Sequence, residues 1–316
     1  MAEEKKKSIN SVQIVGTLVE TGNLKYDANA ENKKNPKIKG AIVREDYKKP
    51  AFVIDVNGQK IGVSPMPTYK TKVDKEGKLV DNPQFKGLEK NMDLEVGTRV
   101  IVRGSISVGD PYAGKNGVIE PVSVNMYSMS STSVPNEDMA EGKVSGFIKD
   151  IKAETKGEDE EETGRLNVDF WLYDDYNDAV KPFPLIVDED IAEGFEETYE
   201  GGESAILCFD IVVRTVGGKK GKSAGFGRKE SKIVGGFERA EYSIFDGEDA
   251  LDDESPYYID EDDFKVMFKA HKQKCEEAKN AEKNDEKPSK KKGLGSSRKS
   301  KVVDDDYDDV DDDPFE

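Results

Sequence analysis

The sequence predicts a mainly β protein: two small five-stranded barrels in tandem, then one amphipathic helix, a basic linker and an acidic tail, the last two disordered. Short runs of alternating apolar and polar residues dominate residues 1–250, which indicates many short strands and few helices. The order of these runs in the first half of the chain is repeated in the second half. Residues 283–316 carry too much charge to form a core.

Residues 1–128 form the first predicted barrel. Its opening strand, Ile9–Glu20, alternates in polarity and is interrupted by Gly16. A strand pair is expected near Ala41–Val43 and Ala51–Val56. The other expected elements are a short strand at Lys60–Val63, a helical turn within Pro83–Asp93, a turn and strand over Leu94–Val108 with Gly104 near its centre, and a closing strand near Gly117–Met126.

Residues 141–250 form the second predicted barrel, after an interdomain linker at residues 129–140. The opening strand, Lys143–Lys149, contains Gly146 at the place that Gly16 occupies in the first copy. The other elements follow the order of the first copy: a strand at Leu166–Tyr173, its partner at Pro182–Val187, a helix over Asp188–Tyr199 with Asp188 as its cap, a turn and strand over Glu200–Arg214, and a closing strand within Ser231–Ile244.

A glycine inside a strand weakens that strand unless it bends sharply or another backbone comes close. A closed five-stranded sheet needs such bends, and a short helix between its third and fourth strands is typical of the oligonucleotide/oligosaccharide-binding (OB) fold. Both copies therefore resemble OB folds in the order and spacing of their elements. An unrelated small β-barrel or sandwich, present twice, is the alternative.

Residues 251–282 comprise an acidic segment and a helix predicted over Asp260–Lys283. This helix carries one apolar stripe, formed by Phe264, Met267, Phe268, His271 and Cys275. The stripe is expected to pack against a barrel or a partner chain. His271 and Cys275 are four residues apart and could face one metal ion, but two ligands do not make a site, so no metal is expected.

The last two segments differ sharply in charge. Residues 283–303 hold eight basic and two acidic residues, whereas residues 304–316 hold nine acidic residues and no basic one. This acidic tail ends in Asp311, Asp312, Asp313, Pro314 and Phe315, followed by Glu316. Its layout resembles that of single-stranded-DNA-binding proteins, and tandem barrels are most similar to the phage or plasmid type. The resemblance implies that the tail, through these acids and Phe315, binds replication or repair proteins.

The net charge of -18 argues against nucleic-acid binding if the chain is taken as a whole. The charge is uneven, however: residues 1–140 hold 21 basic and 18 acidic residues, whereas residues 141–282 hold 19 and 37. The first copy is therefore the better candidate for contact with an anion. The acidity of the second copy argues against DNA binding by that copy, unless local clusters of basic residues make the contact.

Single strands are held by cations for the phosphates and by exposed rings on which bases stack. The candidates in the first copy are Arg44, Tyr47, Lys48, Lys49, Tyr69, Lys70, Arg99, Arg103, Tyr112 and Lys115. Those in the second copy are Trp171, Tyr173, Arg214, Lys219, Lys220, Lys222, Phe226, Arg228 and Lys229. Trp171 and Phe52 fit a core equally well, because a ring in an alternating strand usually faces inward, and the lysine-rich loop could serve solubility alone.

These observations predict a protein that binds and protects single-stranded DNA with little sequence preference during replication, recombination or repair. The alternative is a non-catalytic adaptor or virion component that uses its barrels for protein contacts. The sequence shows no set of nucleophile, base and metal ligands, and Gly217–Ser223 lacks the spacing of a nucleotide-binding loop. We therefore expect no enzyme activity and no cofactor, and we expect a cytoplasmic protein with no membrane segment.

Overall fold

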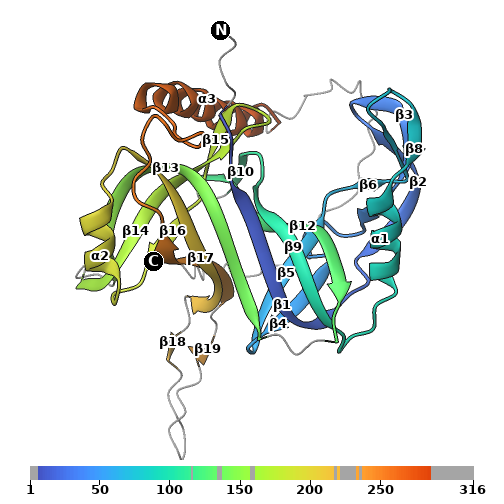
Figure 1. Cartoon of the computed structure of the whole chain (residues 1–316), viewed down its shortest axis with the longest axis horizontal. Coiled ribbons are helices and arrows are strands. Elements are labelled where there is room, and N and C mark those ends of the chain that lie inside the picture. The colour runs from blue at the N-terminus through green and yellow to red at the C-terminus, as the bar shows by residue number, and fades with distance from the viewer. Residues whose placement is uncertain are drawn as a thin grey trace, which may run out of the picture.

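The computed structural model of the chain describes residues 6–114, 117–133, 137–156, 161–216, 219–220, 233–234 and 237–285 (Figure 1). The basic linker and the acidic tail lie outside these residues, apart from the end of the last helix. Strands dominate the described part, and none of its helices is long and apolar enough to cross a bilayer. The predicted mainly β fold class is confirmed.

Five strands close the first barrel through the pairings β1–β4, β4–β5, β5–β12, β12–β9 and β9–β1. Only the β5–β12 pairing is parallel. The bounds of these strands are β1 Asn10–Glu20, β4 Phe52–Val56, β5 Gln59–Pro65, β9 Arg99–Val108 and β12 Val122–Ser131.

The second barrel repeats this arrangement through the pairings β13–β14, β14–β16, β16–β20, β20–β17 and β17–β13. Again one pairing, β16–β20, is parallel, and β15 (Ala179–Pro182) extends the edge of β14. The strands are β13 Met139–Lys156, β14 Glu161–Asp174, β16 Leu185–Val187, β17 Glu203–Val216 and β20 Phe237–Gly247. The expected repeat of strand order is therefore present.

Gly16 and Gly146 occupy equivalent places in the opening strands β1 and β13. A Cβ atom on Gly16 would lie 2.3 Å from the carbonyl oxygen of Asp55, and one on Gly146 would lie 2.2 Å from that of Trp171. Each glycine therefore lets the opening strand approach the second strand of its barrel at a distance that no side chain permits.

The two barrels are joined directly by their opening strands. β1 pairs with β13 in antiparallel register from Asn10 opposite Val144 to Val15 opposite Met139. All ten barrel strands and β15 thus belong to one continuous hydrogen-bonded sheet. β12 and β13 also extend into the predicted linker from both sides, so only residues 132–138 lie between them.

A hairpin arm stands off the first barrel between β1 and β4 (Figure 1). It consists of β2 (Leu24–Asn32) and β3 (Asn35–Arg44), and the short strand β6 (Thr68–Tyr69) pairs with β3. The expected pairing of Ala41–Val43 with Ala51–Val56 is therefore wrong: β3 pairs with β2, while β4 pairs with β1 and β5. The other short hairpins are β7 (Thr71–Val73) with β8 (Leu79–Asp81), β10 (Tyr112–Gly114) with β11 (Gly117–Ile119), and β18 (Lys219–Lys220) with β19 (Ile233–Val234).

The described residues contain helices α1 (Pro83–Met92), α2 (Ala192–Thr198) and α3 (Glu261–Asp285). Asn82 caps α1, because its Oδ1 accepts the backbone N–H of Gln84 at 3.1 Å. Asp188 does not cap α2 as expected. The helix begins after Ile191 without a side-chain cap, and the Asp188 carboxylate instead accepts hydrogen bonds from Arg165, Arg214 and Ser243.

The barrel interiors form one continuous apolar core. A second, smaller core lies between α3 and the outer face of β13 and β14, and Phe147, Trp171, Tyr173, Ile259 and Phe264 are buried there. Phe264 stacks on Phe147 with ring centroids 4.0 Å apart. Phe264, Met267 and Phe268 of the predicted apolar stripe thus pack on the second barrel.

Candidate nucleic-acid interface

The hairpin arm presents a row of exposed cations. Its exposed lysines are Lys25, Lys33, Lys34, Lys37 and Lys39. The arm is anchored to α1 by the edge-to-face contact of Tyr26 with Phe85, whose ring centroids lie 5.9 Å apart. Gly40 has a φ of 72°, and a Cβ atom on this residue would lie only 2.4 Å from the Tyr26 hydroxyl oxygen. Glycine therefore leaves room for the Tyr26 side chain. The anchored arm thereby holds these charges near the first barrel.

A groove of about 610 Å³ separates the arm from β12 and α1. Its apolar wall includes Ile38, Leu88 and Met129, and its polar lining residues include Lys34, Lys72, Asn32, Asn35, Asn82, Asn91 and Asn125. Within the described structure, the buried Oδ1 atom of Asn125 has no hydrogen-bond partner. The groove can therefore offer cations and amide groups to a ligand with an apolar face.

Two tyrosine rings line this groove. Tyr127 projects from β12 with 56% of its surface exposed, and its hydroxyl donates a hydrogen bond of 2.5 Å to Ser105 Oγ. Tyr69 is half-buried and donates to the carbonyl oxygen of Glu31 at 3.0 Å. Because both hydroxyls are bonded to the protein, the rings are held in place before any ligand arrives.

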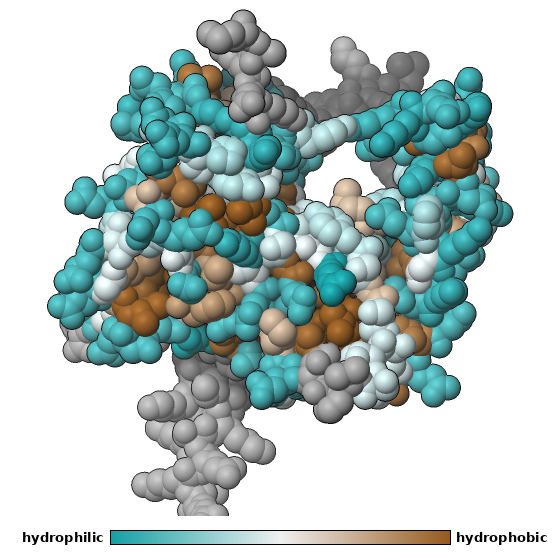
Figure 2. Space-filling model, viewed as in Figure 1, coloured by the Kyte–Doolittle hydropathy of each residue, from teal (hydrophilic) through white to brown (hydrophobic). Residues whose placement is uncertain are grey.

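The tip of the arm reaches the second barrel. Lys34 Nζ donates a hydrogen bond to the Tyr176 hydroxyl and lies 4.4 Å from the centroid of that ring. Tyr176 lies in the turn between β14 and β15. In Figure 2 the arm, at the right of the view, meets the rest of the molecule above an opening. Since Lys34 also lines the groove, the groove extends to this contact between the barrels.

A second group of predicted residues lies at the base of the arm. The Arg44 guanidinium lies 4.8 Å from the centroid of the exposed Tyr47 ring and donates to the carbonyl oxygens of Tyr47 and Lys49. Lys48 and Lys49 are exposed in the same turn, and Lys70 is exposed beside Tyr69. The structure therefore brings the predicted cations Arg44, Lys48 and Lys49 together with one ring.

The remaining predicted residues of the first barrel are scattered. Arg103 is exposed on β9, while Arg99 forms an ion pair with Asp138. Tyr112 is half-exposed on the β10–β11 hairpin, away from the groove lining, and Lys115 lies outside the described residues. Of these residues, Arg103 lies next to the groove tyrosines, because it pairs with Ser128, the residue after Tyr127 on β12.

Trp171 and Tyr173 are not available for base stacking in this structure. They point outward from β14, where α3 covers them, so that only 6% of Trp171 and 5% of Tyr173 is exposed. Edge-on contacts with Phe264 and Phe268 surround the Trp171 ring. Phe52 is likewise core, inside the first barrel. The inward or covered position of each ring follows from apolar residues on both faces of its strand.

Arg214 is bound within an ion network of the second barrel. It and Arg165 both contact Asp188 and Glu241, and Arg165 also contacts Glu154. Of the lysine-rich loop, only the backbone of Lys219 and Lys220 is described. Lys222, Phe226, Arg228 and Lys229 lie outside the described residues, as do Asp311, Asp312, Asp313, Pro314 and Phe315 of the tail.

Sequence reasoning missed the residues that define the groove. Lys34 and Tyr127 were not among the predicted site residues, because nothing local marks them as neighbours. Lys33 and Lys34 could have been recognised as candidates. They lie between β2 and β3, and basic residues in a hairpin turn usually point to solvent. One cluster of described residues, Glu120, His271 and Cys275, could hold a metal ion, and it lies apart from the groove.

The sequence matches one known family over residues 8–299, and that family is YorF. The chain belongs to the YorF family. No curated protein matches this YorF-family sequence.

Two solved structures of single-stranded DNA binding protein from Thermus aquaticus are similar in fold. A deletion mutant has a TM-score of 0.44 at 12% identity and covers 78% of this chain and 97% of its own. The wild type has a TM-score of 0.41 at 11% identity, covering 78% and 95%.

Proposed function

We propose that this YorF-family protein binds single-stranded DNA in the groove between the arm and the first barrel. The observation that carries the proposal is a groove lined by the rings of Tyr69 and Tyr127 and by Lys34 and Lys72, on an arm whose other lysines are exposed. Phosphates would lie along the lysines while bases stack on the rings. A duplex hides the faces of its bases, so this arrangement favours single strands, and stacking gives little sequence preference.

The proposed role is protection of single-stranded DNA during replication, recombination or repair, without catalysis, in the cytoplasm of a bacterial or phage-infected cell. The two halves of the chain differ in how they would act on phosphate. The negative net charge of the second barrel repels phosphate, whereas the first half carries a small positive charge. In this proposal the first barrel makes the principal contact with DNA, and the lysine-rich loop between β17 and β20 adds a local one.

A second candidate function is that of a protein-interaction adaptor. It is favoured by the apolar part of the groove lining, where Met66 is 62% exposed and lies beside Pro65, Pro67 and Val73. An extended peptide with apolar side chains would fit such a surface, and it would not depend strongly on salt. The two candidates therefore differ in a property that can be measured.

The proposal is tested by fluorescence anisotropy of a labelled oligo-dT at several salt concentrations, with duplex as competitor. The informative variant replaces Lys25, Lys33 and Lys37 with alanine, and the matched control replaces Lys265, Lys269 and Lys279, three exposed lysines of α3. Each phosphate neutralised on a single strand contributes about -0.7 to the slope of log K against log salt. We expect the arm variant to lose up to about 2 from the magnitude of this slope.

The control variant should keep the affinity and the salt slope of the wild type. Equal losses in both variants would mean that the arm is not the DNA contact. Binding of apolar peptides without binding of oligo-dT would favour the adaptor instead.

We also propose that the tail, residues 304–316, recruits replication or repair proteins. Its support is compositional: nine carboxylates and Phe315 in thirteen residues. Deleting the tail should abolish capture of such partners and leave oligo-dT affinity unchanged or higher, because the acids would no longer compete with phosphates for the lysines. Weaker DNA binding after the deletion would contradict this competition.

A further inference from the structure

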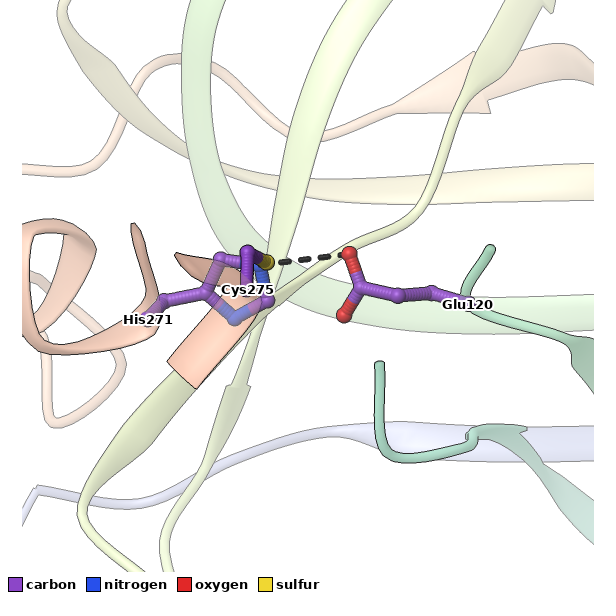
Figure 3. A group of neighbouring side chains, drawn as sticks. All are labelled: Glu120, His271 and Cys275. Carbon is purple, nitrogen blue, oxygen red and sulfur yellow. Dashed lines mark hydrogen bonds and ion pairs between the residues drawn. The ribbon is translucent and has the colours of Figure 1, made fainter. Parts of the chain in front are cut away.

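Three potential metal ligands from two distant parts of the chain meet beside the second barrel. Glu120 follows β11 in the first barrel, whereas His271 and Cys275 lie one turn apart on α3. His271 Nε2 is 3.2 Å from Glu120 Oε2 and 3.4 Å from Cys275 Sγ, and the three ligand atoms all lie within 4.8 Å of one another. Figure 3 shows the three side chains converging, Glu120 from one side and the two helix residues from the other.

These spacings suit one tetrahedral metal ion. Zinc binds thiolate sulfur at about 2.3 Å, imidazole nitrogen at about 2.0–2.1 Å and carboxylate oxygen at about 2.0–2.2 Å. At tetrahedral angles such bonds place sulfur and nitrogen about 3.5 Å apart and nitrogen and oxygen about 3.3 Å apart. The two observed distances match these values within a few tenths of an ångström, and the third pair, the Cys275 sulfur and a Glu120 oxygen, lies within 4.8 Å.

We propose that Glu120, His271 and Cys275 form a Zn²⁺ site. A thiolate, an imidazole and a carboxylate are the donor types that select zinc over the hard cations Mg²⁺ and Ca²⁺. One Zn²⁺ with the two anionic ligands is electrically neutral, which suits a half-buried place. A hollow of about 240 Å³ adjoins Glu120 and His271, so water can occupy the fourth coordination position.

The neighbouring charges act on a metal ion in both directions. Asp110 and Asp178 line the same hollow, while Lys274 and Lys181 also line it and oppose a cation. The Trp171 ring lies edge-on to the imidazole with centroids 5.0 Å apart, which restrains the orientation of His271. Burial, together with the charge of Glu120, raises the pKa of the Cys275 thiol. Zinc would displace the thiol proton, so binding should release protons and weaken as the pH falls.

The site would fasten the two barrels to each other through α3. The helix packs its apolar stripe on β13 and β14 of the second barrel, whereas Glu120 belongs to the first barrel. A zinc ion at this place would therefore add a bond between them that does not involve the proposed DNA groove. The proposal is independent of DNA binding and survives if that function fails.

The test uses the untagged full-length chain, because an oligohistidine tag would itself bind zinc. Bound zinc is measured after gel filtration of wild type, Cys275→Ser, His271→Asn and Glu120→Gln. The matched controls are Cys208→Ser, which removes the other cysteine, and Glu95→Gln, an exposed glutamate of the first barrel. We expect one zinc ion per chain in wild type and both controls, and a loss of at least tenfold in affinity in Cys275→Ser and His271→Asn.

Cobalt distinguishes this site from weak binding by the acidic tail, since only a thiolate ligand gives a sulfur-to-cobalt charge-transfer band. Wild type and Cys208→Ser should show this band, and Cys275→Ser should not. Zinc should also slow alkylation of Cys275 in the native wild-type protein, a measurement that requires no variant to fold. Unchanged alkylation, or zinc bound equally by Cys275→Ser and wild type, would overturn the proposal.

Discussion

Lys34 Nζ, at the tip of the first barrel's arm, lies 4.4 Å from the centroid of the Tyr176 ring in the second barrel. This contact joins two segments that are 142 residues apart in the chain. Both side chains are exposed, so the contact contributes little to folding and can open and close readily. In the proposed function, opening of this contact would admit a DNA strand to the groove, and its closing would hold the DNA there.

Replacing Lys34 with alanine should free the tip of the arm. An exposed contact of a lysine with a ring contributes about 0.5–1 kcal/mol, so global stability should change little. Hydrogen exchange of residues 28–37 should become faster, and Tyr176→Ala should have the same effect. The neighbouring exposed Lys33→Ala is the control and should leave the exchange unchanged. If exchange of the arm is the same in all variants, the contact does not restrain it.

Removing the Tyr127 ring should weaken binding of oligo-dT. A stacked base contributes about 1–3 kcal/mol, so Tyr127→Ala should raise the Kd by about fivefold to 150-fold. Tyr127→Phe keeps the ring and loses only the hydrogen bond to Ser105, so its Kd should stay near that of wild type. Phe245→Ala, which removes an exposed ring from the second barrel, is the control. A Kd unaffected by Tyr127→Ala would place the bases elsewhere.

Truncating Phe264 should detach α3 from the second barrel. Loss of a buried phenylalanine costs about 3–5 kcal/mol of unfolding free energy. Trp171 is the only tryptophan and lies beneath this helix, so its fluorescence should shift to the red in Phe264→Ala as the ring meets water. Val266→Ala, at a position 71% exposed on the same helix, should change neither quantity. An unshifted emission maximum would mean that α3 remains docked.

The Asp188 carboxylate should make stability depend on pH in the acidic range. Burial opposes its charge, but the Ser243 hydroxyl and the guanidinium groups of Arg165 and Arg214 hold the pKa of Asp188 below its usual value. A lowered native pKa stabilises the fold above the unfolded value of about 3.9, and this stabilisation is lost as the pH falls below it. Urea unfolding should thus separate wild type from Asp188→Asn at neutral pH, with a difference that shrinks as the pH falls below the unfolded pKa of about 3.9.

The exposed Asp190→Asn serves as the control, and its difference from wild type should be small at every pH. A difference between wild type and Asp188→Asn that is constant across the pH range would mean that Asp188 acts through packing rather than through its charge.

The barrel strands could be predicted because alternate residues of each strand are apolar and face the barrel interior. Leu166, Val168, Phe170 and Leu172 alternate along β14, and all four are buried in the barrel. The arm could not be predicted in the same way. β2 stands off the barrel, and Leu24 is its one buried residue. Its sequence, Leu24–Asn32, alternates apolar and polar residues, but two of the four apolar residues are alanines, which are a weak signal for a strand. Its absence from the prediction then led to the wrong partner for β3.

The candidate sites depend on contacts between distant residues, which local patterns do not encode. His271 and Cys275 share a helix face that the sequence makes evident, but Glu120 is 151 residues from His271 and reaches it only through the fold. Trp171 shows the opposite problem. Its strand, β14, is apolar on both faces, but the sequence of the strand does not indicate that α3 covers the outer face.

The antiparallel partnership of β1 and β13 has a consequence for how the two halves are related. If Gly146 is taken as the counterpart of Gly16, the pairs Asn10 with Val144 and Ile14 with Ala140 exchange places under a local twofold rotation centred near Val12 and Gly142. Two separate chains of one barrel each could form an isologous dimer by pairing their opening strands in this way. Here both copies of that edge lie on one polypeptide, so their association cannot be lost on dilution.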